Sequence, residues 1–96
     1  MDNTYEGWPN IETWNIAFWI ANDSTQCRYW NNLAQNLINE GIHKHDASIY
    51  LSDTLQREIK PPKIKSEPWS NFLYHAANQI YWREIAEHLL ADKEPT

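Results

Sequence analysis

Three neighbouring residues offer the spacing in this chain that is most typical of a metal site. His43, His45 and Asp46 lie in a polar stretch, and alternate residues of an extended segment point to the same side. Zinc takes three or four protein ligands, so His75 or His88 would have to fold back to complete the set. Most such pairs are solvated loop residues. We therefore predict no bound metal and no cofactor.

The other reactive side chains have plainer interpretations. Glu84 and His88 lie four residues apart and share a helical face, which suits acid–base chemistry in a pocket but is more typical of a surface pair. Cys27 is the one cysteine, so an internal disulfide is excluded, and we expect a half-buried thiol in a cytoplasmic protein. With two glycines, the chain has no phosphate-binding loop. These features predict that the protein is not an enzyme.

The composition is that of one small acidic domain. The chain has 96 residues, a net charge of −5 and a mean hydropathy of −0.76, with no apolar run long enough for a membrane span and no signal-peptide pattern at its start. Such a charge disfavours binding to duplex DNA and favours a basic surface on another protein. The acidic residues that we expect to contact a partner are Asp2, Glu6, Glu12, Glu84, Glu87, Asp92 and Glu94.

Apolar spacing and capping residues predict helices throughout the chain. They are expected near 11–21, 24–40, 47–59, 67–80 and 82–91, with a proline-rich basic segment at 60–65 that is either a linker or a docking site. The apolar face slips after Ile80, which indicates either one long helix with two buried faces or a break near Tyr81, and we favour the break. Gly41 is the expected left-handed end of the second helix. The N-caps that we expect are Asn10, Asp23, Asp46 and Ser66.

These elements predict an all-α fold, a compact single domain of four to five helices around an aromatic-rich core. The block from Gly7 to Asp23 holds three of the six tryptophans and has almost no polar face, so it must be enclosed or serve as a contact surface. The side chains that we expect in the core are Trp14, Phe18, Trp30, Leu33, Leu37, Leu51, Leu55, Trp69, Phe72, Leu73, Ile80, Ile85 and Leu89.

The opening block Gly7-Trp8-Pro9-Asn10-Ile11-Glu12-Thr13-Trp14-Asn15 resembles a small and largely uncharacterised domain family of bacteriophages, plasmids and bacterial genomes. The family opens with Gly-Trp-x-Asn-x-Glu-Thr-Trp-Asn, and the segment from Trp82 to Leu89 is similar to its closing helix. The two matches cover about a third of the chain. Pro9 departs from a usually polar position, and Tyr81 stands where the family has a residue that can cap the last helix.

The resemblance implies an all-α fold and a phage or mobile-element origin, and it supplies no catalytic residues. Together with the acidity, it predicts a non-enzymatic, anti-CRISPR-like protein that binds and inhibits a host defence complex in the host cytoplasm. The partner would be a host protein or ribonucleoprotein whose basic nucleic-acid-binding surface the acidic residues occupy. The alternative is a regulatory or assembly module that acts as a homodimer. The remote alternative is a metal hydrolase that uses His43, His45 and Asp46.

Overall fold

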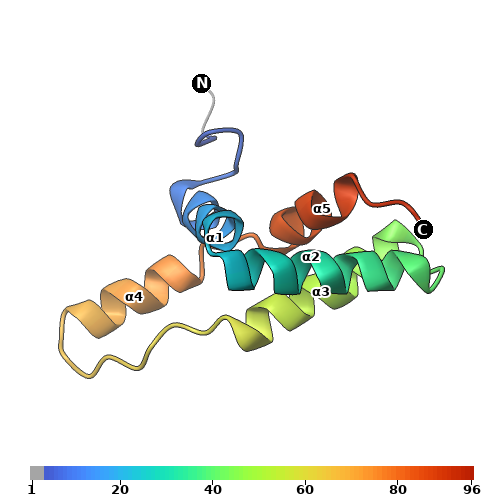
Figure 1. The fold of residues 1–96 in the computed structure, drawn as a ribbon. Coiled ribbons are helices and arrows are strands. Elements are labelled where there is room, and N and C mark those ends of the chain that lie inside the picture. The colour runs from blue at the N-terminus through green and yellow to red at the C-terminus, as the bar shows by residue number, and fades with distance from the viewer. Residues whose placement is uncertain (1–3) are drawn as a thin grey trace.

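Five α-helices make up the part of the chain that the computed structural model describes, residues 4–96 (Figure 1). This confirms the predicted all-α fold in one domain. Among these residues, none of the helices is both long and apolar enough to span a lipid bilayer. The helices are α1 (Ile11–Asn22), α2 (Ser24–Asn39), α3 (Lys44–Glu58), α4 (Trp69–Ala77) and α5 (Trp82–Ala91).

The first two helices begin at the predicted caps. The Oδ1 atom of Asn10 accepts the backbone N–H of Thr13 at 2.9 Å, and Oδ1 of Asp23 accepts that of Gln26 at 3.0 Å. Each bond satisfies an amide that has no partner within its own helix. At the other end of α2, Gly41 has φ +82°, the left-handed conformation predicted for it.

The start of α3 corrects the predicted boundary. The helix begins at Lys44, and its N-cap is His43, whose Nδ1 accepts the backbone N–H of His45 at 3.2 Å. Asp46 is therefore not the cap. It lies in the first turn, where its negative charge faces the positive end of the helix dipole. Histidine is an uncommon cap, which is why the sequence pattern pointed to the aspartate instead.

The helix α4 (Trp69–Ala77) is shorter than the predicted helix at 67–80. The helix starts at Trp69 after Pro68, and no side chain caps it, so the expected N-cap at Ser66 is wrong. It ends at Ala77, and α5 begins at Trp82, so the predicted break in this region is confirmed. Residues 60–65 carry no helix or strand, as consecutive prolines dictate.

The core lies between α2, α3 and α5, and α1 packs across the first part of α2 (Figure 1). Five predicted core side chains are buried, and three more pack partly buried against them. The buried five are Trp30, Leu37, Leu51, Leu55 and Ile85, and the partly buried three are Leu33, Ile80 and Leu89. The Nε1 atom of Trp30 donates to Oε1 of Gln26 at 2.9 Å, so its indole is buried without an unpaired donor.

The aromatic part of the predicted core is largely wrong. Phe18, Trp69 and Phe72 are 53%, 61% and 69% exposed, and Trp14 and Leu73 are half-buried outside the main core. An almost wholly apolar helix such as α1 can bury only the face that meets its neighbours. α4 projects away from the other helices (Figure 1), and for this reason it has no buried residue.

One polar junction fixes where α4 leaves the body. The hydroxyl of the fully buried Thr13 donates to Oδ1 of Asn10 at 2.6 Å and accepts the N–H of Tyr81 at 3.0 Å. The Nδ2 atom of Asn10 donates to the carbonyl of Gln79 at 2.7 Å. The start of α1 therefore holds the turn between α4 and α5, some seventy residues away in the chain.

Candidate interaction surfaces

The structure does not gather the candidate metal ligands into one site. The segment from His43 to Asp46 is a helix start and not an extended loop, and the His43 ring is used as its cap. Within residues 4–96, no three His, Cys, Asp or Glu side chains could hold a metal ion together. His75 lines a surface pocket that Glu12 also lines, and His88 stacks on Trp8.

A small pocket brings together two side chains that the sequence did not connect. Cys27 and His88, from α2 and α5, both line a cavity of about 210 Å³ beneath Trp8. The Nδ2 atom of Asn31 donates to Sγ of Cys27 at 3.6 Å and to the Cys27 carbonyl at 2.8 Å. The cavity therefore has a half-buried thiol on one wall, as expected for Cys27. Only the packing of α5 on α2, not the sequence spacing, brings the two together.

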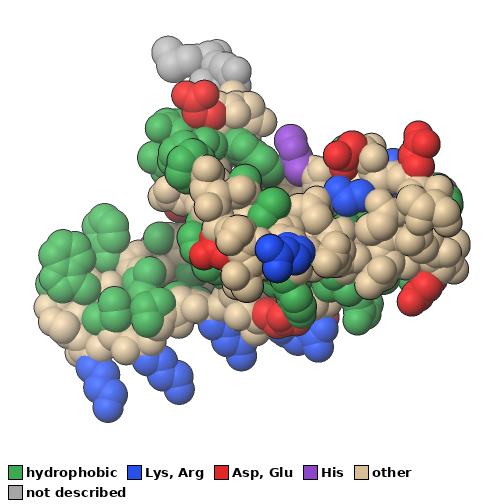
Figure 2. Space-filling model, in the orientation of Figure 1, with side chains coloured by type: hydrophobic (Ala, Val, Ile, Leu, Met, Phe, Trp, Pro, Cys, Tyr) green, Lys and Arg blue, Asp and Glu red, His purple; other side chains and the backbone are tan. Residues whose placement is uncertain are grey.

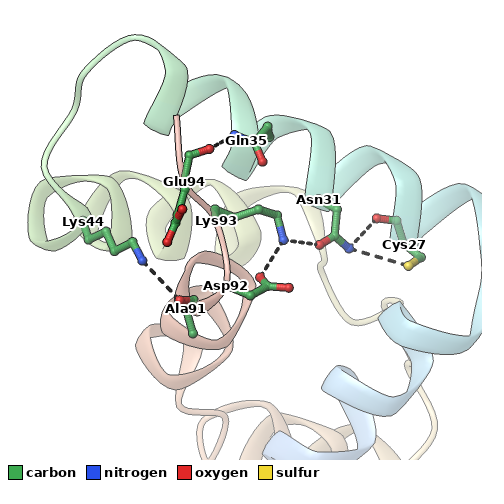
Figure 3. A network of polar contacts seen from close by, with 8 residues as sticks. All are labelled: Cys27, Asn31, Gln35, Lys44, Ala91, Asp92, Lys93 and Glu94. Carbon is green, nitrogen blue, oxygen red and sulfur yellow. Dashed lines mark hydrogen bonds and ion pairs between the residues drawn. The ribbon is translucent and has the colours of Figure 1, made fainter. Parts of the chain in front are cut away.

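The C-terminal residues are fastened to α2 by a polar network (Figure 3). The ammonium of Lys93 donates to Oδ1 of Asn31 at 2.8 Å and pairs with Oδ1 of Asp92 at 3.0 Å. This hydrogen bond and positive charge lower the pKa of Asp92 below its usual range. The Nε2 atom of Gln35 donates to the carbonyl of Glu94 at 2.7 Å. Asp92 and Glu94, the last two predicted partner-binding acids, are therefore held next to α2.

The exposed side of α5 carries an acidic stripe, Glu84 and Glu87, one turn apart. The Trp8 ring stacks on His88 with centroids 4.0 Å apart, and so attaches the N-terminal turn to the same helix. That turn is closed by two backbone hydrogen bonds between residues 5 and 8, of 2.7 and 2.8 Å, and it exposes Glu6. We call the five acids of this region the acidic face: Glu6, Glu84, Glu87, Asp92 and Glu94.

Two of the predicted partner-binding residues do not belong to the acidic face. Asp2 lies outside the described residues. Glu12 points to the other side of α1, where it lines a groove of about 350 Å³ between α1 and α4. The walls of that groove are otherwise mostly apolar, and include Ile16, Leu73 and Trp82. The predicted partner-binding acids among the described residues therefore fall on two separate surfaces, with Glu6 next to α5 and Glu12 in the groove.

Aromatic side chains form two exposed clusters. On α1, Trp14 lies 5.0 Å from both the Tyr5 and the Phe18 ring, measured between centroids. On α4, the Trp69 and Phe72 centroids are 6.1 Å apart. In Figure 2 these apolar side chains appear as an upper and a lower green lobe at the left, separated by a notch, with Lys and Arg side chains along the lower edge.

Comparison with protein families, curated proteins and solved structures gives no match to this chain. The resemblance of the opening block therefore stays a prediction. The geometry itself presents an acidic face on α5 and the N-terminal turn, and a separate aromatic projection at α4.

Proposed function

We propose that this protein acts by binding, and that its acidic face occupies a basic surface of a host defence complex of the CRISPR-effector type. The observation that carries the proposal is the Trp8–His88 stack, because it joins acidic residues from the two ends of the chain. Glu6, Glu84 and Glu87 are all exposed there, and within residues 4–96 none of them forms an ion pair.

Electrostatics supports a partner that normally holds nucleic acid. Acidic residues concentrated on one face attract a basic groove over several ångströms and accelerate encounter with it. The Debye length at physiological ionic strength is about 8 Å, so this attraction weakens as salt rises. The structure fits such a role because Trp8 and the bonds of Lys93 and Gln35 hold the acidic face in place before any partner arrives. A preordered face loses less entropy on binding than a flexible one.

The experiment is a plaque assay in bacteria that carry a CRISPR effector directed against a test phage. Expression of the wild-type chain should restore plating of the phage for at least one effector type in a panel. The variant Glu84→Lys with Glu87→Lys should lose this effect and keep the helical circular-dichroism spectrum, since both side chains are exposed.

A matched variant separates the acidic face from net charge. Glu40→Lys with Asp53→Lys changes the net charge by the same amount at two exposed positions, one directly after α2 and one on α3. It should retain the inhibition. Loss of inhibition in both double variants, or retention in both, contradicts the acidic face as the binding surface. If the wild-type chain relieves no effector in the panel, the host-defence proposal is wrong.

A further inference from the structure

In the projecting segment, residues 60–81, the turn after α4 is bonded to the start of α1, but α4 itself has no residue that its own chain buries. We call this segment the α4 arm. Its helix has nine residues, none of them buried, whereas isolated helices need about 12–15 residues to be even marginal in water. Trp69, Phe72 and Tyr74 are 61%, 69% and 65% exposed. Only the inner side of the helix, with Leu73 and Ala76, faces the groove beside α1. A helix this short with this much exposed apolar surface is stabilised when another surface buries its aromatic side chains.

The surface area of the chain indicates how large that covering surface is. The chain exposes 6893 Å². A folded monomer of 11.4 kDa is expected to expose about 5,800 Å², so the excess is about 1,100 Å². The radius of gyration is 14.6 Å, against about 12.5 Å for a domain of this length. Each partner in a standard protein–protein interface buries about 800 Å². The excess is therefore of the size that one stable interface covers.

The charges of the arm and of the body are opposite. Three lysines and one glutamate give residues 60–81 a net charge of +2, which leaves −7 on the rest of a chain whose total is −5. Glu12 lies in the groove at the foot of the arm, whose walls are mostly apolar but also hold Lys60 of the arm itself. A second copy of the chain therefore offers what the arm lacks: an apolar groove of about 350 Å³ with an acidic residue in its wall.

We propose that two copies of this chain form a symmetric dimer through their α4 arms. The aromatic side of each arm, with Trp69 and Phe72, covers the groove between α1 and α4 of the other copy. The basic segment with Lys63 and Lys65 then lies next to the other copy's Glu12. A two-fold axis makes both contacts twice, so one complementary pair of surfaces closes the assembly without leaving a site for a third copy.

Sedimentation equilibrium of the full chain over a range of concentrations tests the dimer. The wild-type chain should have twice the mass of its 11.4 kDa monomer. Trp69→Ala with Phe72→Ala should raise the dissociation constant by roughly 100-fold or more, because two large apolar side chains leave the interface. Ile49→Ala with Tyr50→Ala is the matched control, since these α3 side chains are 46% and 52% exposed, and it should leave the dimer intact.

A charge exchange tests the arrangement itself. Glu12→Lys should weaken the dimer, and adding Lys63→Glu and Lys65→Glu should restore it. A wild-type monomer at every concentration overturns the proposal, as does a dimer that survives the Trp69 and Phe72 substitutions. A wild-type chain that remains monomeric and binds a single-stranded oligonucleotide through the arm overturns it in favour of nucleic acid. If the charge exchange does not restore the dimer, the arm does not lie against Glu12.

Discussion

The junction at Thr13 gives the sharpest prediction about stability. Thr13→Val keeps the size and branching of the side chain but removes the hydroxyl that bonds Asn10 at 2.6 Å and the N–H of Tyr81 at 3.0 Å. Each lost hydrogen bond costs about 1 kcal/mol, and an unpaired partner in a part-buried site adds to that. We expect the free energy of unfolding to fall by about 2–3 kcal/mol. A chain of this length has about 5–14 kcal/mol in total.

Urea titration followed by tryptophan fluorescence and far-ultraviolet circular dichroism measures this loss. Protein concentration is held constant, because dimerisation makes apparent stability depend on it. The thermal midpoint should fall by about 10–20 °C. Thr25→Val is the control, since Thr25 is exposed in the first turn of α2, and it should change the free energy by less than about 0.5 kcal/mol. A Thr13→Val loss no larger than that of the control refutes the junction.

Two further predictions concern pH. The pKa of Asp92 is lowered by its bond to Lys93, so this pair stabilises the fold above the pKa of an unfolded aspartate, and the contribution is lost as pH falls through the lowered value. Between neutral pH and about pH 2, the thermal midpoint of Asp92→Asn should therefore fall less than that of the wild-type chain; equal losses contradict the pair. The pKa of Tyr29 is raised by its hydrogen bond to Glu58, 2.9 Å to Oε1, so that contribution is present below the pKa of an unfolded tyrosine and is lost as pH rises through the raised value. The variant Tyr29→Phe should therefore lose less stability than the wild-type chain above about pH 9.5. If the thermal melts of the two proteins coincide in that range, the bond does not contribute to stability.

The helix boundaries that the sequence predicted well depend on local chemistry. Asn10, Asp23 and Gly41 act within three residues of themselves, through one side-chain oxygen or one left-handed backbone conformation. Such signals need no knowledge of the rest of the fold. The start of α3 was predicted wrongly because a histidine caps it. Its cap is a ring nitrogen of His43, and the usual capping preferences do not include histidine.

Burial was harder to predict, because it is a property of pairs of elements. The spacing of Trp69, Phe72 and Leu73 correctly places apolar residues along α4, but periodicity says only which residues share a face. Whether a face is covered depends on where the chain enters and leaves the helix. Here the proline segment at 60–65 and the junction at Thr13 fix those two points, and they hold α4 away from the core.

The same limit explains why a net charge of −5 was an incomplete guide to partners. The total is the sum of a basic arm and an acidic body, and the count for residues 60–81 could be made from the sequence alone. Its meaning depends on geometry, because lysines folded back onto the body would have neutralised the nearby acids. Since α4 projects, Lys63 and Lys65 form no ion pair with the acids of the body among the described residues, although Lys60 lines the same groove as Glu12. A second copy can therefore bring them together, while the acidic face on α5 stays free for a different partner.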